Sequence, residues 1–363
     1  MKKVMAALSG GVDSSLAAAL LKKKGFAVVG LTMCLGVKVK DLGTRRRPLC
    51  CSSQAIEDAR RVCAVLDIPH YIFDFERQLR EKVINNFIRD YLKGKTPNPC
   101  VRCNRYIKFD LLFKRAKSLG TDYLATGHYA GIARKKNSFF LRRAKDPNKD
   151  QSYFLYAIKK EMLKFILFPL ENFTKFEVRR KAQELNLPVS SKPESQEICF
   201  IPSNDYKGFI RQRARELKIE IKPGLIIDRK GKVLGKHQGI CFYTIGQREG
   251  LGISAKKPLY VIKIDYKNNN LIVGFKEDTY FKGLIACKLN LFIEYPKRAF
   301  LCKAKIRYNH KEAEAKVIPL GKSRIKVIFK QAQAAVCPGQ SVVLYDADLV
   351  LGGGIIERGL MRT

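Results

Sequence analysis

An alternation of apolar runs with amphipathic stretches over residues 1–130 constrains the fold of this chain more than any other feature. The amphipathic stretches have apolar residues at helical spacing, and Gly25 and Gly120 follow two of them as C-terminal caps. The largely apolar runs resemble strands covered on both faces of a sheet, and they lie at 3–9, 26–35, 70–75 and 122–127. This order predicts an α/β fold with an open parallel sheet, whose ligands bind at the carboxyl ends of the strands.

The remainder of the chain changes pattern twice. A hairpin is predicted at 131–143 with its turn at Lys136–Asn137, and helices follow at 151–186, where Thr174 and Glu177 have capping-box spacing. Beyond about residue 205 a short helix leads into strands, and the last 80 residues contain five or six short β segments, which suggest a closed barrel. We therefore expect three domains: a catalytic α/β domain, a small β-rich central domain and a C-terminal β-barrel, at 1–205, 206–282 and 283–363.

The charge balance points to a polyanionic partner. The chain has 70 Lys and Arg against 33 Asp and Glu, a formal net charge of +37. A surplus of this size attracts polyanions and makes their binding salt-dependent, so nucleic acid is the expected partner; a merely solvated basic surface is the alternative. No apolar run approaches the roughly 18 residues of a membrane span. We expect a cytoplasmic protein without a membrane partner.

The phosphate-binding candidate is "LSGGVDSS" at residues 8–15, between the first predicted strand and helix. Glycines let the backbone approach an anion, and the loop amides and the helix N-terminus supply donors. No lysine follows the glycines, as one does in the P-loop; Asp13 and two serines do instead. Such a loop suits pyrophosphate as a leaving group, with Asp13 placed to bind Mg²⁺. The alternative is a glycine turn capped by serine.

Three of the eleven cysteines stand in distinctive surroundings. The number is odd and the spacing irregular, which does not suit a secreted disulfide scaffold, so most are expected to be buried thiols. Cys100 and Cys103 lie in "TPNPCVRC", read as a loop with two prolines, and Arg102 and Arg105 flank Cys103. Basic neighbours lower a thiol pKa toward neutrality and so favour the reactive thiolate. Cys199 follows a further loop.

Several motifs resemble those of known enzymes. "LSGGVDSS" resembles the pyrophosphate loop of the ATP-pyrophosphatase (PP-loop) superfamily. Seven further stretches resemble, in order across the chain, the tRNA uridine 2-sulfurtransferases; they are 96–110, 125–130, 146–156, 191–202, 235–253, 305–308 and 351–358. The resemblance implies an adenine-nucleotide-hydrolase-like catalytic domain. It also implies that ATP adenylates the C2 oxygen of the wobble uridine (position 34) of tRNA, after which sulfur displaces AMP.

The resemblance also implies roles for particular residues. Cys103 would be the nucleophile and Cys199 would carry persulfide sulfur from a donor protein, and the two would end as a disulfide. ATP would be bound by Ala7, Leu8, Ser9, Gly10, Gly11, Val12, Asp13, Ser14, Met33 and Gly127. The target base would face Asn98, Pro99 and Cys100, and other tRNA contacts would come from His128, Lys149, Asp150, Gln151, Arg307, Tyr308 and Gln340.

Cys100 departs from the family pattern, since many members have aspartate there. A structural zinc site needs four ligands, and the sequence offers only three here, Cys100, Cys103 and Cys199. These three cysteines could instead hold a [4Fe–4S] cluster whose fourth iron is free to bind sulfide. A persulfide relay and a cluster therefore both stay open.

The basic insert at 36–48 is expected to be a mobile surface loop. The chain is expected to be a monomer. The rival functions are another adenylating thiolase, such as one making 4-thiouridine, and an RNA-binding protein without catalysis.

Overall fold

The computed structural model describes residues 1–36, 53–194, 198–201, 205–321 and 323–361. The chain divides into two compact units with separate hydrophobic cores. The first comprises Met1–Val83, Cys100–Asn204 and Ala347–Val350, and the second Ile84–Pro99, Asp205–Asp346 and Leu351–Thr363. The loop expected at 36–48 falls, apart from Gly36, outside the described residues.

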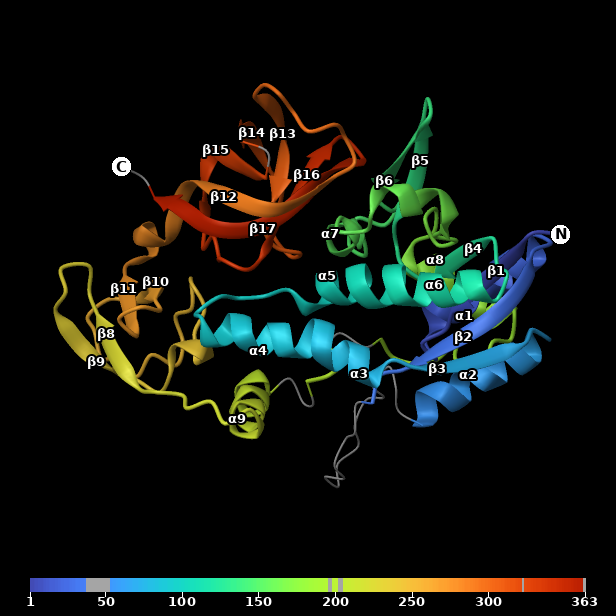
Figure 1. Ribbon diagram of the computed structural model, residues 1–363, viewed down its shortest axis with the longest axis horizontal. Coiled ribbons are helices and arrows are strands. Elements are labelled where there is room, and N and C mark those ends of the chain that lie inside the picture. The colour runs from blue at the N-terminus through green and yellow to red at the C-terminus, as the bar shows by residue number, and fades with distance from the viewer. Residues whose placement is uncertain (37–52, 195–197, 202–204, 322, 362–363) are drawn as a thin grey trace. The chain divides into compact units, whose positions relative to one another are not determined.

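The first unit contains a five-stranded parallel sheet with strand order β3-β2-β1-β4-β7 (Figure 1). Its strands are β1 (Lys3–Ala7), β2 (Ala27–Cys34), β3 (His70–Asp74), β4 (Tyr123–Thr126) and β7 (Ile166–Leu167). The four predicted strands are all present, and the open parallel sheet is confirmed. β3 is an edge strand, however, with Tyr71 46% exposed, so the expectation that every apolar run is covered on both faces is wrong for this one.

Helices accompany this sheet. They are α1 (Val12–Lys23), α2 (Ser53–Val65), α3 (Glu76–Leu79), α5 (Pro99–Cys103), α6 (Leu112–Ser118), α7 (Ser152–Leu155) and α8 (Lys175–Glu184). Gly25 and Gly120 have φ of 79° and 68°, as expected for C-terminal caps. The capping box of Thr174 and Glu177 is present at the start of α8. The hairpin is formed by β5 (Gly131–Lys135) and β6 (Ser138–Arg142), as predicted.

Helix α1 packs closely in this unit because its side chains are small. Ala17, Ala18 and Ala19 are at most 5% exposed, and Ala18 packs in one cluster with Val4, Ala6 and Val28 of the sheet. The other side of α1 packs against Val178 and Ala182 of α8. The N-terminus of α1 is therefore fixed by packing on two sides.

The second unit begins with α4 (Asn85–Leu92), which packs against α9 (Tyr206–Glu216) through the ring pairs Phe87–Phe209 and Tyr91–Tyr206. A four-stranded sheet follows with order β10-β11-β8-β9. Its strands are β8 (Gly224–Ile227), β9 (Val233–His237), β10 (Tyr260–Asp265) and β11 (Asn270–Gly274).

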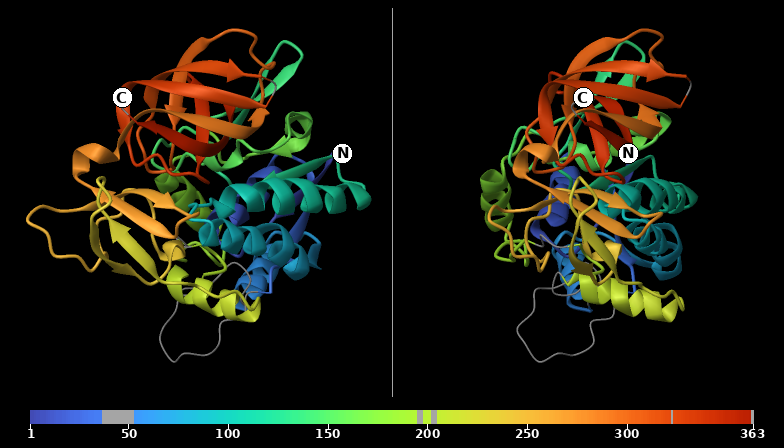
Figure 2. Two further views of the ribbon diagram at one scale, coloured as in Figure 1. Left: turned by 60° about the vertical axis from the view of Figure 1, so that its left-hand side comes forward. Right: turned by 90° about the vertical axis from the view of Figure 1, so that its left-hand side faces the viewer.

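Six further strands close into a barrel, as predicted, because β12 pairs with both β15 and β17 (Figure 2). They are β12 (Tyr280–Leu291), β13 (Phe300–Lys305), β14 (Ala313–Leu320), β15 (Arg324–Ala334), β16 (Ser341–Asp346) and β17 (Leu349–Met361). Register shifts between Phe281 and Gly283 occur in both pairings of β12, and such bulges bend a strand and increase its twist. In the described part of the chain, no helix combines the length and apolarity needed to cross a membrane.

Candidate active site

The glycine loop lies at the point where the strand order of the first sheet reverses. β2 lies on one side of β1 and β4 on the other, and the loop joins β1 to α1. Ligands of open parallel sheets bind at such a switch point. Gly10 has φ of 67°, and a Cβ there would lie 2.3 Å from the carbonyl oxygen of Ala55, so only glycine fits.

Serine hydroxyls hold the loop in shape. Ser14 Oγ donates to Gly11 O at 3.1 Å and accepts from Ser9 N–H at 3.1 Å, while Ser15 Oγ donates to Gly11 O at 2.9 Å. Gly11 is the N-cap of α1 and has no side chain to satisfy the first amides of the helix. Those amides and the helix dipole suit an anion, as the sequence predicts.

The residues expected at the nucleotide come to one edge of the sheet. Ala7 ends β1, Met33 lies near the end of β2, and Gly127 directly follows β4. A Cβ on Gly127 would lie 2.6 Å from Ser14 N and 2.7 Å from Asp13 C, so the end of β4 touches the start of α1. The structure thus brings Ala7–Ser14, Met33 and Gly127 to the carboxyl ends of three adjacent strands.

Asp13 is the centre of a charged network that the sequence analysis does not predict. Lys175 Nζ lies 2.6 Å from Asp13 Oδ1, and the Tyr129 hydroxyl donates to the same oxygen at 2.8 Å. Lys175 Nζ also lies 2.8 Å from Glu194 Oε1, and Lys149 Nζ lies 2.7 Å from Glu194 Oε2. Burial and the Asp13 carboxylate raise the pKa of Tyr129, which keeps its hydroxyl protonated as a donor.

A second lysine reaches the loop from the same segment as Glu194. Lys192 Nζ donates to Gly10 O at 2.8 Å and pairs with Asp58 Oδ2 at 2.6 Å. Partial burial acts to raise the pKa of Asp58, but hydrogen bonds from Lys192 and Gln54 outweigh it and lower the pKa. Lys192 lies in the stretch 191–202 that carries the family resemblance, whereas Lys175 lies outside all such stretches. In neither case does the sequence indicate a contact with this loop.

His128 follows β4 and has both ring nitrogens engaged. Nδ1 lies 2.8 Å from Thr126 Oγ1, and Lys108 Nζ lies 3.4 Å from Nε2. Because ammonium can only donate, Nε2 accepts and Nδ1–H donates to the threonine. Burial, with Lys108 second, holds the pKa of His128 well below its ordinary value, so the ring is neutral at pH 7.

Cys100 and Cys103 lie on a helix rather than in the predicted loop. α5 begins at Pro99, and proline is favoured at the first position of a helix because its missing N–H is not needed there. Cys100 is exposed and Cys103 is 9% exposed, one turn apart. A π-helical segment, Asn104–Leu111, continues this helix toward α6.

The basic residues around Cys103 converge on Tyr106. The Arg102 and Arg105 guanidinium carbons lie 4.9 and 5.2 Å from the centre of its ring. Arg102 also donates two hydrogen bonds to the carbonyl of Lys82, at 2.8 and 3.1 Å. Arg102, which directly precedes Cys103 in the chain, is therefore part of a cationic cluster at the Tyr106 ring.

Cys199 is half-buried in the short described stretch 198–201, where it precedes the buried Phe200. Among the residues that the structure describes, no three Cys, His, Asp or Glu side chains are arranged to hold a metal ion. Cys100, Cys103 and Cys199 therefore do not form a cluster site in this arrangement.

Asp150 is one of the residues of the first unit that are expected to contact tRNA. It is only 4% exposed, however, and its side chain faces inward. Its carboxylate accepts from Ser152 Oγ at 2.8 Å and Ser152 N at 3.1 Å. Gln151 Oε1 accepts from Tyr129 N at 2.9 Å. Asp150 and Gln151 thus shape the turn that follows Lys149 and position Tyr129 beside Asp13.

In the second unit, Gln340 holds the segment that leads to Asn98 and Pro99. Its side-chain amide donates to Thr96 O at 3.1 Å and Pro97 O at 3.4 Å. Thr96 N donates in turn to Pro338 O at 2.8 Å. Gln340 and Pro338 therefore contact Thr96 and Pro97, although the two pairs lie far apart in the sequence. Arg307 and Tyr308 lie elsewhere on this unit; Arg307 donates to Ala334 O, and Lys305 lies 5.5 Å from the Tyr308 ring.

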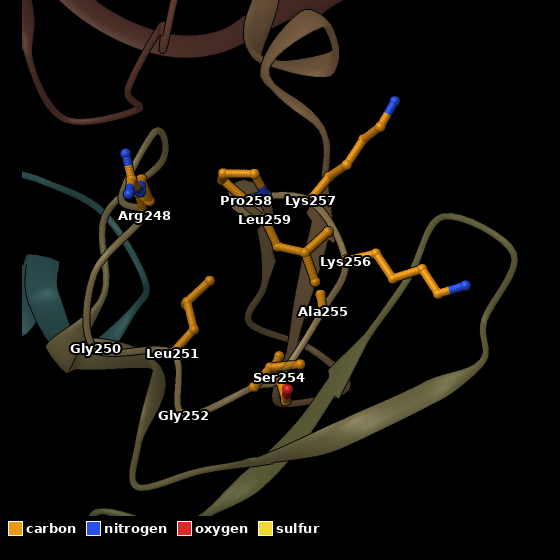
Figure 3. A pocket seen from close by; sticks show the side chains of 11 residues that line it. Arg248, Gly250, Leu251, Gly252, Ser254, Ala255, Lys256, Lys257, Pro258 and Leu259 are labelled. Atoms are coloured by element: carbon orange, nitrogen blue, oxygen red, sulfur yellow. The ribbon is translucent and has the colours of Figure 1, made fainter.

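The second unit also has a pocket of about 510 Å³, lined mainly by residues 250–259 (Figure 3). Leu251 and Leu259 lie between Arg248 on one side and Lys256 and Lys257 on the other. Most of its wall consists of glycine, alanine, leucine and basic residues, and none of the described residues that line it is an acid, a histidine or a cysteine.

Comparison with protein families matches three consecutive regions of the chain. Residues 2–203 match the tRNA methyl transferase HUP domain, 214–275 the tRNA methyl transferase PRC-barrel domain, and 281–356 the aminomethyltransferase beta-barrel domain. Together the three regions cover most of the described residues of both units.

Full-length relatives share about half of the residues. The tRNA-specific 2-thiouridylase MnmA 1 of Syntrophus aciditrophicus is 50% identical over 359 residues, which cover 99% of this chain and 94% of that protein. The tRNA-specific 2-thiouridylase MnmA of Acetivibrio thermocellus is 49% identical over 98% of this chain and 99% of that protein. The protein of the same name from Carboxydothermus hydrogenoformans is 49% identical over 99% of this chain and 98% of that protein. This chain belongs to the tRNA-specific 2-thiouridylase family of sulfurtransferases.

Proposed function

We propose that this protein is an ATP-dependent tRNA uridine 2-sulfurtransferase that thiolates C2 of uridine 34. The observation that carries the proposal is full-length identity of about 50% to relatives named tRNA-specific 2-thiouridylase. The glycine loop at the sheet's switch point and the net charge of +37 supply what the reaction needs, an anion site and attraction for RNA. The proposed domains are 1–205, 206–282 and 283–363.

ATP is proposed to bind at Ala7–Ser14, Met33 and Gly127. The loop fits a polyphosphate because Gly10 has a positive φ and Gly11 leaves the first amides of α1 uncapped. Mg²⁺ fits the single carboxylate of Asp13, since it is usually held by one or two carboxylates together with phosphates and water. When bound, it would neutralise charge that develops on the phosphates.

Cys103 is proposed as the nucleophile and Cys199 as the persulfide carrier. In this relay, ATP first adenylates the C2 oxygen of the base and releases pyrophosphate. The terminal sulfur of the Cys199 persulfide then replaces that oxygen at C2, AMP leaves with it, and Cys103 forms a disulfide with Cys199. A reductant must restore both thiols. The support for Cys103 is its place in the chain between Arg102 and Arg105, whose guanidinium carbons lie 4.9 and 5.2 Å from the centre of the Tyr106 ring.

The proposed partners are a tRNA with uridine at position 34 and a protein that donates persulfide sulfur, and the chain is proposed to act as a monomer. The target base is proposed to face Asn98, Pro99 and Cys100. His128, Lys149, Arg307, Tyr308 and Gln340 are proposed to contact tRNA. Asp150 and Gln151 would act there by holding the turn beside Lys149.

Analysis of tRNA nucleosides by mass spectrometry tests the function. Deleting the gene should remove 2-thiouridine from position 34 and leave 4-thiouridine and 2-thiocytidine unchanged. Restoring the wild-type gene should return 2-thiouridine, and an Asp13→Ala gene should not. Unaltered 2-thiouridine in the deletion strain, or loss of another thionucleoside instead, would refute the assignment.

Gly127→Ala should weaken ATP binding about tenfold or more, as expected for overpacking that costs about 1–3 kcal/mol. The new methyl group would lie 2.6 Å from Ser14 N and displace the start of α1. Gly235→Ala is the matched control, because its Cβ would meet Ile253 Cγ1 at an ordinary 3.6 Å. Isothermal titration of both variants, with thermal unfolding as a folding check, makes the comparison. Wild-type ATP affinity in Gly127→Ala would mean that nucleotide binds elsewhere.

A further inference from the structure

A lysine on the helix of Cys103 reaches the edge of the sheet at which the glycine loop lies. Lys108 lies five residues after Cys103, in the π-helical segment Asn104–Leu111, whose hydrogen bonds join residues five apart. Its ammonium nitrogen lies 3.4 Å from Nε2 of His128. His128 directly follows Gly127, which touches the start of α1. Lys108 therefore links the helix of Cys103 to the carboxyl end of β4, where the nucleotide is proposed to bind.

The partner of Lys108 leaves the charge of the lysine intact. An ammonium group can only donate, so Nε2 of His128 accepts and the ring is neutral. Thr126 Oγ1 lies 2.8 Å from Nδ1, accepts the remaining ring proton and fixes this tautomer. Lys114, on the next helix, pairs with Asp110 at 3.2 Å, whereas no ion pair among the described residues includes Lys108. The half-buried ammonium of Lys108 thus keeps its full positive charge for another anion.

Aromatic rings fix the imidazole that orients this lysine. The centre of the His128 ring lies 5.9 Å from that of Phe109 and 6.2 Å from that of Phe168, and the two phenyl rings are 6.1 Å apart. Both phenylalanines are at most 6% exposed. Burial, with the charge of Lys108 second, also keeps the pKa of His128 low, so the ring stays an acceptor at pH 7. The ammonium of Lys108 is therefore held in place before any ligand binds.

The proposed reaction creates negative charge in this region. In adenylation, the C2 oxygen of the base bonds to the α-phosphorus, the bond from that phosphorus to the bridging oxygen of pyrophosphate breaks, and the N3 proton of the base passes to water. Negative charge gathers on the non-bridging oxygens of the α-phosphate, where a preorganised cation lowers the barrier. The loop would hold the pyrophosphate portion and Cys103 would lie near the base. The α-phosphate then lies between the loop and the helix of Cys103, the two parts that Lys108 links.

We propose that Lys108 is a catalytic residue that binds the α-phosphate of ATP during adenylation, and that His128 and Thr126 are positioning residues that hold its ammonium. The assignment rests on the proposed function, because it takes ATP to bind at the loop and the target base to lie near Cys103.

The test measures pyrophosphate release from Mg²⁺-ATP in a single turnover of the full-length protein. ATP and a tRNA with uridine at position 34 are both saturating, and no persulfide donor is present. This step precedes sulfur transfer, so an effect on it cannot come from the thiolate of Cys103. Lys108→Met should lower the rate about 10²-fold, as expected when one preorganised donor to a transition state is removed. The Kd of ATP and that of tRNA should each change by less than about threefold.

Lys108→Arg keeps the cation and should recover part of the lost rate. Lys114→Met is the matched control, because it removes a lysine whose side chain is 69% exposed and which already pairs with Asp110. Its rate should equal that of wild type. His128→Leu removes the acceptor and should lower the rate about tenfold, the size expected for loss of one hydrogen bond. His128→Gln places Oε1 near the position of Nε2 and should recover most of that loss.

Thermal unfolding verifies that each variant is folded, and the two His128 variants decide the test if Lys108→Met does not fold. A wild-type rate in Lys108→Met would overturn the proposal, and so would a loss confined to the Kd of ATP, since Lys108 would then act in binding alone. Equal losses in His128→Leu and His128→Gln would overturn the positioning role of His128. If wild-type protein releases no pyrophosphate with this tRNA, the proposed function fails together with the role of Lys108.

Discussion

Cys103→Ser should reduce formation of 2-thiouridine by roughly 10³-fold or more, because a serine hydroxyl cannot replace the thiolate that the relay requires. Cys199→Ser should have an effect of the same order, since it removes the persulfide carrier. Cys100→Ser should retain most of the activity. Cys100 is exposed one helical turn before the buried Cys103, and the relay assigns it contact with the base but no bond to sulfur.

The measurement is single-turnover thiolation of tRNA with a persulfide donor, with tRNA affinity measured in parallel. In all three variants tRNA affinity should stay within about twofold of wild type. A fall in affinity that matches the fall in activity would make the cysteines structural. The Cys100 variant is the internal control, because it differs from the Cys103 variant by one turn of the same helix.

The same three variants decide between relay and cluster. If all three abolish activity, and iron in anaerobically purified wild-type protein is lost in each, then a [4Fe–4S] cluster replaces the relay. A cluster needs Cys100, Cys103 and Cys199 to come together as ligands, an arrangement that is not found among the described residues. The relay requires only that Cys103 and Cys199 meet.

The fold could be predicted from the sequence wherever one local signal decides the structure. The apolar runs of β1, β2 and β4, the caps at Gly25 and Gly120, and the capping box at Thr174 each depend on a few neighbouring residues. The number of barrel strands followed from turn signals in the same way. Closure of the barrel is less local, since it needs β12 to pair with two strands.

The sequence did not reveal contacts between single residues from distant segments. Lys175, Glu194 and Tyr129 have no period or motif that would link them to Asp13, and more than half of the cations in this chain lack an acid to pair with. The inward orientation of Asp150 depends on hydrogen bonds to Ser152 that no spacing rule indicates. The two prolines of residues 96–99 favour a loop, whereas proline is equally suited to begin a helix, and here Pro99 begins α5.

Raising the salt concentration from 50 to 200 mM should weaken tRNA binding by roughly 10³-fold or more, provided that six or more phosphates are contacted. The physical reason is release of condensed counterions from RNA when lysine and arginine side chains neutralise its phosphates. With 70 basic and 33 acidic residues, more than half of the cations cannot have an acidic partner of their own, so enough remain to act on RNA.

The slope of log K against log [salt] can also identify individual contacts. Arg307→Gln should reduce its magnitude by about one if the guanidinium meets a phosphate. Lys330→Gln is the control on the same barrel, since Lys330 is exposed and pairs with Glu314 at 2.7 Å. Thermal unfolding at both salt concentrations verifies that the protein stays folded. A flat salt response would mean that the basic surface is only solvated, and tRNA would then have to be recognised through uncharged contacts despite a charge of +37.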